Sequence, residues 1–202
     1  MQTQVTPSCG VQRRQCAAAM AGLWWLATTG NAAAAPTQSR FEPSMTVQGV
    51  PLVLNGAGTR YRAVFRVYEM GLYVPRKVGT AEELLALPGP KAIRFFAMRD
   101  LESTDIGLAF VKGMRANATP EETRRHVPSM SRLIEVFSVR SRMAPGGTFA
   151  MEFHPDKGTV FFIENQQQGA AVGDAEFFNM ALKIWVGGSP VEPLLKDALL
   201  GA

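Results

Sequence analysis

The chain has 202 residues, a formal net charge of +4 and only two cysteines, Cys9 and Cys16. Its basic residues are scattered, without the dense block that typifies a nucleic-acid-binding surface, so we expect no nucleic-acid partner. Both cysteines lie in an N-terminal segment that we expect to be removed. This excludes disulfides, cysteine nucleophiles and thiolate metal sites from the mature protein.

The first 34 residues have the three parts of a secretory signal peptide. A basic pair, Arg13 and Arg14, precedes an apolar run over residues 16–27, and small residues follow at 31–35. The alternative is a transmembrane anchor, but the run is shorter than the ~20 residues that span a bilayer. We therefore expect cleavage after Ala34, no stable membrane anchor, and a periplasmic or secreted protein.

After a loose arm at residues 35–45, we expect one domain over residues 46–202, and it begins with strands. Residues 50–54 form a short apolar strand, and Asn55 to Gly58 have the composition of a turn. The alternation from Thr59 to Val74 predicts one long extended strand. One of its faces carries Arg60, Arg62, Val64, Arg66 and Tyr68.

Helical signals dominate the middle of the domain. Thr80 is expected to cap a short helix that ends near Ala86, before a strand at residues 91–98. A helix capped by Ser103 or Thr104 follows, with its apolar stripe at Ile106, Phe110, Val111 and Met114. Thr119, Pro120 and Glu122 then form a capping box, and Pro128 should interrupt the helix that starts there.

The last part of the chain predicts a hairpin and two more helices. Residues 148–153 and 159–163 are the hairpin strands, and residues 169–172 are a candidate short strand. Asp174 should cap a helix that ends at Gly187, and a final helix should cover residues 191–200. This order predicts an α+β fold with a mostly antiparallel sheet.

Few residues have the spacing of a catalytic or metal site. The two histidines, His126 and His154, have no neighbouring ligand at metal-binding spacing, so we expect structural or surface roles, no metal and no cofactor. Arg60 and Tyr68 stand out instead. Their face is either a solvent-exposed basic stripe or the wall of a cleft, where a buried guanidinium needs an anionic partner. A ligand carboxylate or enolate is the candidate partner, with the Tyr68 hydroxyl as a further donor.

Several segments resemble the chalcone isomerase family, closest to its bacterial exported branch. They are residues 54–60 (LNGAGTR), 67–74 (VYEMGLYV), 173–178 (GDAEFF), 184–187 (IWVG) and 190–196 (PVEPLLK). The resemblance spans nearly the whole chain after the expected signal peptide. It implies an open-faced sandwich, in which helices cover one face of a large antiparallel sheet and a ligand cleft lies between them.

The resemblance also implies a chemistry. Plant members cyclise a chalcone to a flavanone by intramolecular conjugate addition, and an arginine at the position of Arg60 stabilises the developing anion. The other positions differ. Tyr68 stands in place of a threonine, Ile106 and Gly113 in place of a tyrosine and an asparagine, and Ile184 in place of a serine or threonine. The polar network that orients the substrate is therefore missing, and we do not expect flavonoid chemistry.

An arginine and tyrosine pair is similar to the fatty-acid-binding branch of the same fold, where the pair holds a carboxylate. We therefore predict a monomer that binds a small amphipathic or aromatic acid. The predicted ligand-binding residues are Arg60, Tyr68, Ile106, Phe110, Gly113, Met114, Phe177, Met180 and Ile184. For the apolar ones, the alternative is ordinary core packing.

Two alternative functions remain at this point. One is an isomerase or lyase that acts on another enone-type substrate by intramolecular conjugate addition, with Arg60 as anion stabiliser and Tyr68 as acid. The other is an interaction module of the cell envelope that binds no small ligand.

Overall fold

The computed structural model describes residues 40–201, and the expected signal peptide lies outside them. An antiparallel seven-stranded sheet in the order β1-β2-β3-β4-β7-β8-β9 forms the centre of this part of the chain. Its strands are β1 (Ser44–Val47), β2 (Val50–Arg62), β3 (Phe65–Val74), β4 (Lys91–Ala97), β7 (Thr148–His154), β8 (Gly158–Ile163) and β9 (Gln166–Gln167). A separate pair is formed by β5 (Leu101–Glu102) and β6 (Arg142–Met143).

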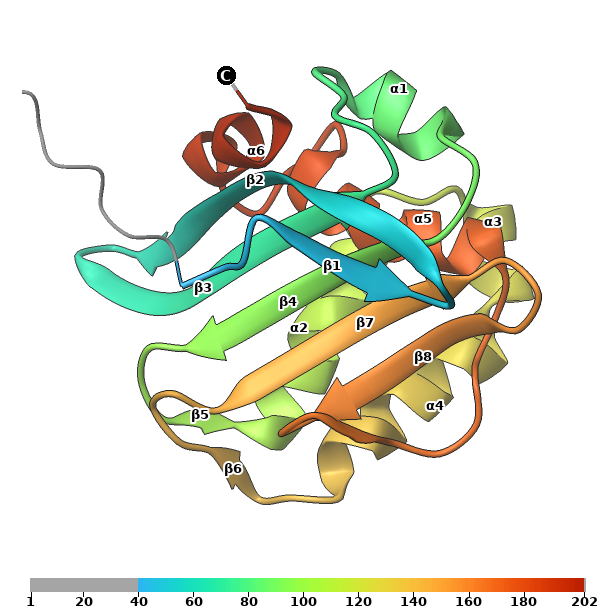
Figure 1. The fold of residues 1–202 in the computed structure, drawn as a ribbon. Helices are drawn as coiled ribbons and strands as arrows, with labels where there is room; N and C mark the ends of the chain where they lie inside the picture. Colours follow the sequence, from blue (N-terminus) through green and yellow to red (C-terminus); the bar gives the residue numbers. More distant parts are fainter. Residues whose placement is uncertain (1–39, 202) are drawn as a thin grey trace, which may run out of the picture. The chain divides into compact units, whose positions relative to one another are not determined.

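Helices cover one face of the large sheet (Figure 1). They are α1 (Ala81–Ala86), α2 (Ser103–Ala116), α3 (Pro120–Arg125), α4 (Val127–Ser138), α5 (Ala175–Val186) and α6 (Pro193–Leu200). Figure 1 shows α2, α4 and α5 behind the strands, and the main hydrophobic core lies between these helices and the sheet. This arrangement confirms the predicted α+β open-faced sandwich. No helix among residues 40–201 has both the length and the apolar character needed to cross a membrane.

The local helix signals are confirmed where a side chain makes the predicted bond. Thr119 forms the predicted capping box with Glu122, and Asp174 accepts the backbone N–H of Phe177 at 3.0 Å. Pro128 lies in the first turn of α4, so the helix breaks at His126 as expected. By contrast, Glu102 is the N-cap of α2, and neither Ser103 nor Thr104 caps it.

Two other boundaries differ from the prediction. In the segment 169–172 only Val172 joins the sheet, through a single bridge to Thr159, and β9 lies earlier. The final helix begins at Pro193, because proline fixes the backbone angle of a first helical turn and lacks the N–H that would be left unpaired there.

The turn predicted at Asn55 to Gly58 is wrong, because β2 runs through this segment with a bulge at Asn55. The Asn55 amide donates to the carbonyl oxygens of Val78 and Leu199, and its own oxygen accepts the Val78 N–H. The glycines serve close packing. A Cβ on Gly58 would lie 2.8 Å from the Leu195 side chain, and one on Gly56 would collide with the α6 backbone.

The single long strand predicted from Thr59 to Val74 is also wrong. The chain turns at residues 63–64, where Ala63 has a positive φ of 53°, and returns as β3. Arg60 pairs directly with Tyr68 across the hairpin. Opposite residues of an antiparallel pair project from the same face, so the two side chains share a face, but from two strands.

The opposite face of the sheet is covered in part by the segment before β1. The loose arm predicted for residues 35–45 is described from Arg40 onward, and there Phe41 is buried and its ring lies 5.3 Å from that of Phe96. Gly71 permits this packing, because a Cβ there would lie 2.6 Å from the Phe41 ring. Residues 40–43 are therefore packed against the sheet.

Candidate functional site

A cavity of about 540 Å³ lies between the helix-covered face of the sheet and helices α2 and α5. Its apolar wall is built from aromatic rings of the sheet and both helices. The Trp185 ring lies 5.3 Å from Phe95 and 5.4 Å from Phe110, and Phe95 is 5.4 Å from Phe149. Stacked, tilted and edge contacts of this kind hold the rings in fixed positions, so the wall is firmly packed.

The rim of the cavity is charged, with more basic than acidic groups. The basic side chains that line it are Arg60, Arg62, Arg99 and Lys112, and the acidic ones are Asp100, Glu102 and Asp105. The Arg142 guanidinium lies near two of these acids, with Nη1 3.9 Å from Oδ1 of Asp100 and Nη2 3.5 Å from Oε1 of Glu102. Its positive charge offsets part of their negative charge. With Arg142 included, and with Glu192 counted as the partner of Arg60, the basic groups still exceed the acidic ones by one, which favours an anionic group at the mouth.

Arg60 lies at this rim with one of its terminal nitrogens already engaged. Its Nη1 is 2.8 Å from Oε2 of Glu192, and it also donates to the Tyr61 carbonyl oxygen. The same carboxylate oxygen accepts the Tyr61 N–H at 2.9 Å. The Nη2 and Nε groups of Arg60 have no partner among residues 40–201. Three of its five N–H donors therefore remain for a second anion.

Tyr68 stands opposite Arg60 and is fixed by the indole of α5. Trp185 Nε1 donates to the Tyr68 hydroxyl oxygen at 2.8 Å, and the part of the chain that the structure describes offers no acceptor for the hydroxyl hydrogen. Burial raises the pKa of Tyr68 to about 12, and the Trp185 hydrogen bond and the Arg60 charge only partly oppose this shift. Tyr68 is therefore a protonated, oriented donor at neutral pH.

The structure brings five of the nine predicted ligand-binding residues to the cavity and places the others in or near the core. The lining residues are Arg60, Tyr68, Ile106, Phe110 and Ile184. Gly113 lies behind the wall, since a Cβ there would be 3.0 Å from Cγ2 of Ile184. The remaining three, Met114, Phe177 and Met180, are fully buried in the core.

Sequence reasoning missed two residues that define the site. Glu192 is 132 positions from Arg60, and only the packing of α6 on β2 brings them together. Trp185 could have been singled out from the sequence, because a buried indole N–H on an otherwise apolar helix needs a hydrogen-bond acceptor. That requirement predicts some partner for Trp185, but not its identity as Tyr68.

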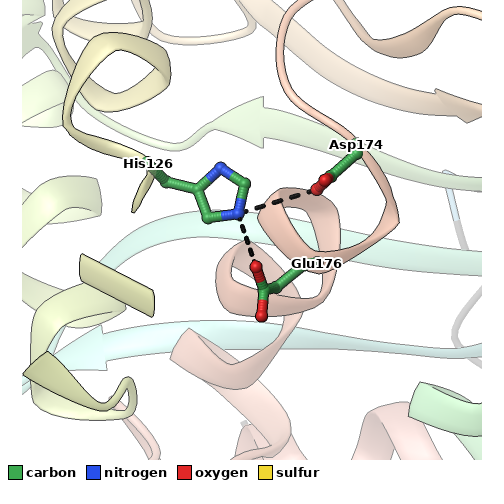
Figure 2. A group of neighbouring side chains, drawn as sticks. All are labelled: His126, Asp174 and Glu176. Atoms are coloured by element: carbon green, nitrogen blue, oxygen red, sulfur yellow. Dashed lines mark hydrogen bonds and ion pairs between the residues drawn. The ribbon is translucent and has the colours of Figure 1, made fainter. Parts of the chain in front are cut away.

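A second polar cluster ties the junction of α3 and α4 to the start of α5 (Figure 2). His126 Nε2 lies 2.9 Å from Glu176 and 3.6 Å from Asp174, and one ligand atom from each residue lies within 4.8 Å of the others. A nitrogen with two carboxylates is a donor set that zinc accepts. However, Arg125 already binds both oxygens of Glu176, and Asp174 caps α5. We interpret the cluster as an ionic anchor between helices.

A smaller cavity of about 250 Å³ lies on the opposite face of the sheet, beside the segment 40–45. Its arginine from the sheet, Arg94, is paired with Glu152 at 2.8 Å. The aromatic cavity is the larger of the two described, and it combines the free donors of Arg60 with the hydroxyl of Tyr68.

Comparisons with known proteins agree with this architecture. A family model described as chalcone isomerase-like matches residues 33–201. Among solved structures, a fatty-acid binding protein of Arabidopsis thaliana matches with a TM-score of 0.64 at 14% identity, over 79% of this chain and 90% of that chain. At that identity the likeness shows the fold alone. A search of curated proteins gives no match.

Proposed function

Since the chain belongs to the chalcone isomerase-like family, we propose that it is a ligand-binding member that takes a small amphipathic anion, such as a fatty acid, into the aromatic cavity. The observation that carries the proposal is that Arg60 and Tyr68 lie opposite each other on β2 and β3 and both line an apolar pocket. The volume of about 540 Å³ falls within the range of small-molecule sites, ~300–1,000 Å³.

The carboxylate of such a ligand would meet the unused nitrogens of Arg60 and the hydroxyl hydrogen of Tyr68. A charged acceptor with these two donors makes short, charge-assisted hydrogen bonds. Glu192 holds the guanidinium in place through Nη1, so the arginine is positioned before the ligand arrives. The acyl chain would lie against the rings of Phe95, Phe110 and Phe149.

Two observations disfavour the alternative isomerase. A general acid works best when its pKa is near the working pH, and the pKa of Tyr68 is about 12. The resemblance also leaves Ile106 and Ile184 where catalytic members carry polar side chains, and both line the cavity here. The solved neighbour is itself described as a fatty-acid binding protein, which supports the same choice.

Titration of the purified protein with hexadecanoic acid, followed by calorimetry, tests the proposal. We expect Arg60→Gln to weaken binding at least tenfold and Tyr68→Phe to weaken it less. Arg66→Gln is the matched control, because Arg66 lies on the same hairpin but does not line the cavity. Absence of binding by the parent protein, or equal binding by Arg60→Gln, contradicts the proposal.

A second pair of variants tests whether the cavity holds the acyl chain. Ile106→Trp places a large ring in the cavity and should abolish binding, whereas Leu108→Trp on the exposed side of α2 should not. Native mass spectrometry of the protein as purified would identify a co-purifying acid. Cyclisation of a chalcone that disappears in Arg60→Ala would instead favour the isomerase.

We also propose that the chain is a monomer of the bacterial exported branch, from which the first 34 residues are removed. The basic, apolar and small-residue order of that segment supports export. N-terminal sequencing of protein from the periplasm or medium should begin at Ala35, and size-exclusion chromatography with light scattering should give one protomer. An uncleaved N-terminus in the cytoplasmic fraction would contradict export.

A further inference from the structure

The tip of the β2–β3 hairpin, residues 61–66, exposes apolar side chains to an unusual degree. Val64 is 82% exposed, Phe65 63% and Tyr61 42%. The pairing of β3 with β4 begins only at Tyr68, so the tip lies beyond the end of β4, as Figure 1 shows. Tyr61 is held by its backbone bond to Glu192, whereas Val64 and Phe65 present most of their surface to solvent, and an exposed apolar apex of this kind suggests a surface that meets a partner.

Arginines flank this apex. Arg62 and Arg66 lie on either side of Val64 and Phe65, and no acidic residue occurs in the sequence from 60 to 68. Arg66 is paired with Glu69, while Arg62 has no ion-pair partner among the described residues. Guanidinium groups next to exposed apolar side chains match the surface of an anionic bilayer, which offers phosphates above an apolar layer.

The tip is also continuous with the cavity mouth. Arg62, within the tip, and Val67, the first residue after it, both line the cavity. A surface that lay against the apex would therefore lie beside the opening. Amphipathic acids with long chains partition into bilayers, so a membrane is where such a ligand would be found.

We propose that the hairpin tip docks on an anionic phospholipid bilayer and that the cavity exchanges its ligand there. The second half of this inference rests on the proposed function. The contact is reversible and shallow, because only two or three apolar side chains enter the interface and the rest of the attraction is electrostatic. It should therefore weaken as salt screens the arginines.

Co-sedimentation with vesicles tests the docking. The protein is mixed with vesicles of phosphatidylethanolamine and phosphatidylglycerol, or of phosphatidylcholine alone, with the same N-terminus in every variant. We expect binding to the anionic vesicles that falls at least fivefold in Val64→Ser/Phe65→Ser. The matched control is Leu108→Ser/Val139→Ser, at positions 57% and 68% exposed but away from the tip, and it should bind like the parent.

Two outcomes would overturn the inference. One is equal vesicle binding by the parent and the tip variant, or none by the parent. The other is a parent dimer that the tip variant converts to a monomer, which would make the tip a protein interface. Hexadecanoic acid binding without vesicles is measured on the same variants. If that binding is intact while docking fails, only the docking is wrong; if that binding is absent from the parent, the proposed function is wrong.

Discussion

The interface between the sheet and its two long helices is solid at one end and hollow at the other. Helix α5 contributes Phe177 and Met180 to the solid part, and Ile184 and Trp185 to the cavity wall. Helix α2 divides similarly, with Met114 in the solid part and Phe110 at the cavity. One apolar stripe thus serves stability over part of its length and ligand binding over the rest.

The contrast between the two ends shows that an apolar stripe identifies the buried face of a helix, but not whether side chains or a cavity lie beneath it. In the solid part, side chains reach the density of a protein interior, where each methylene group contributes to stability. At the hollow end the rings contact one another and leave a volume that no side chain of the described chain fills. Substitutions at the two ends should therefore have different consequences.

The largest difference should come from truncating one side chain at each end. Met180→Ala empties a fully buried site and should lower the free energy of unfolding by about 2–5 kcal/mol. Ile106→Ala faces a cavity that is already present and should cost only roughly 1 kcal/mol. Urea denaturation of both variants measures this. Equal losses would mean that the hollow end is as tightly packed as the solid end.

The next effect concerns the ion pair at the hollow end. Glu192→Gln removes the charge that holds Arg60, so stability should fall by about 1–3 kcal/mol, between the values for exposed and buried pairs. Affinity for a carboxylate ligand should rise, because the guanidinium charge is no longer neutralised. Glu135→Gln, in the exposed pair with Arg132, is the control and should change neither quantity. If Glu192→Gln left the ligand affinity unchanged, the charge of Arg60 would not contribute to ligand binding.

A smaller effect should appear in alkaline solution. The pKa of Tyr68 is about 12 in the folded chain, against about 10 in an unfolded one, because burial disfavours the phenolate. The native state thus keeps a proton that the unfolded state loses, so this contribution is complete below about pH 10 and is lost as pH rises to about 12.

Urea denaturation between neutral and alkaline pH should show this loss in the parent and a shallower one in Tyr68→Phe. Burial also raises the pKa of Tyr73, so part of the decline will persist in the variant. Identical slopes in the two proteins would show that Tyr68 is accessible to water in the empty cavity.

The smallest effect is expected at two glycines of α2. Gly113→Ala places a Cβ 3.0 Å from Ile184, which can move into the cavity, so the gain of about 1 kcal/mol in helix propensity should offset the crowding. Gly107→Ala meets the Cα of Ile134 at 3.3 Å, a backbone atom of α4 that cannot move alone. Thermal unfolding should show little change for Gly113→Ala and a lower midpoint for Gly107→Ala.

Much of the fold could be predicted from the sequence because its signals are local. Thr119 with Glu122 and Asp174 with Phe177 act within one helical turn, and the structure contains both caps. The glycines at 56 and 58 could not be interpreted locally. They permit a helix more than 130 residues away to approach β2, whereas their composition alone indicated a turn.

The site was predictable in part for the same reason. Arg60 and Tyr68 were predicted to share a face, and they do, but they reach it across a hairpin rather than along one strand. The ion pair with Glu192 depends on the packing of α6, and no local pattern reports such packing. The apolar stripe could not distinguish Phe110 at the cavity from Met114 in the core.

The seating of α6 on Gly56 and Gly58 has a practical consequence for work on this protein. Glu192 is the residue before α6, so the packing of this helix on β2 helps to hold the Glu192 carboxylate beside Arg60. Removal of α6, or a bulky fusion that displaces it, should therefore weaken the hold on Arg60 and alter the apparent ligand preference. Expression designs that leave residues 190–201 native would avoid this artefact.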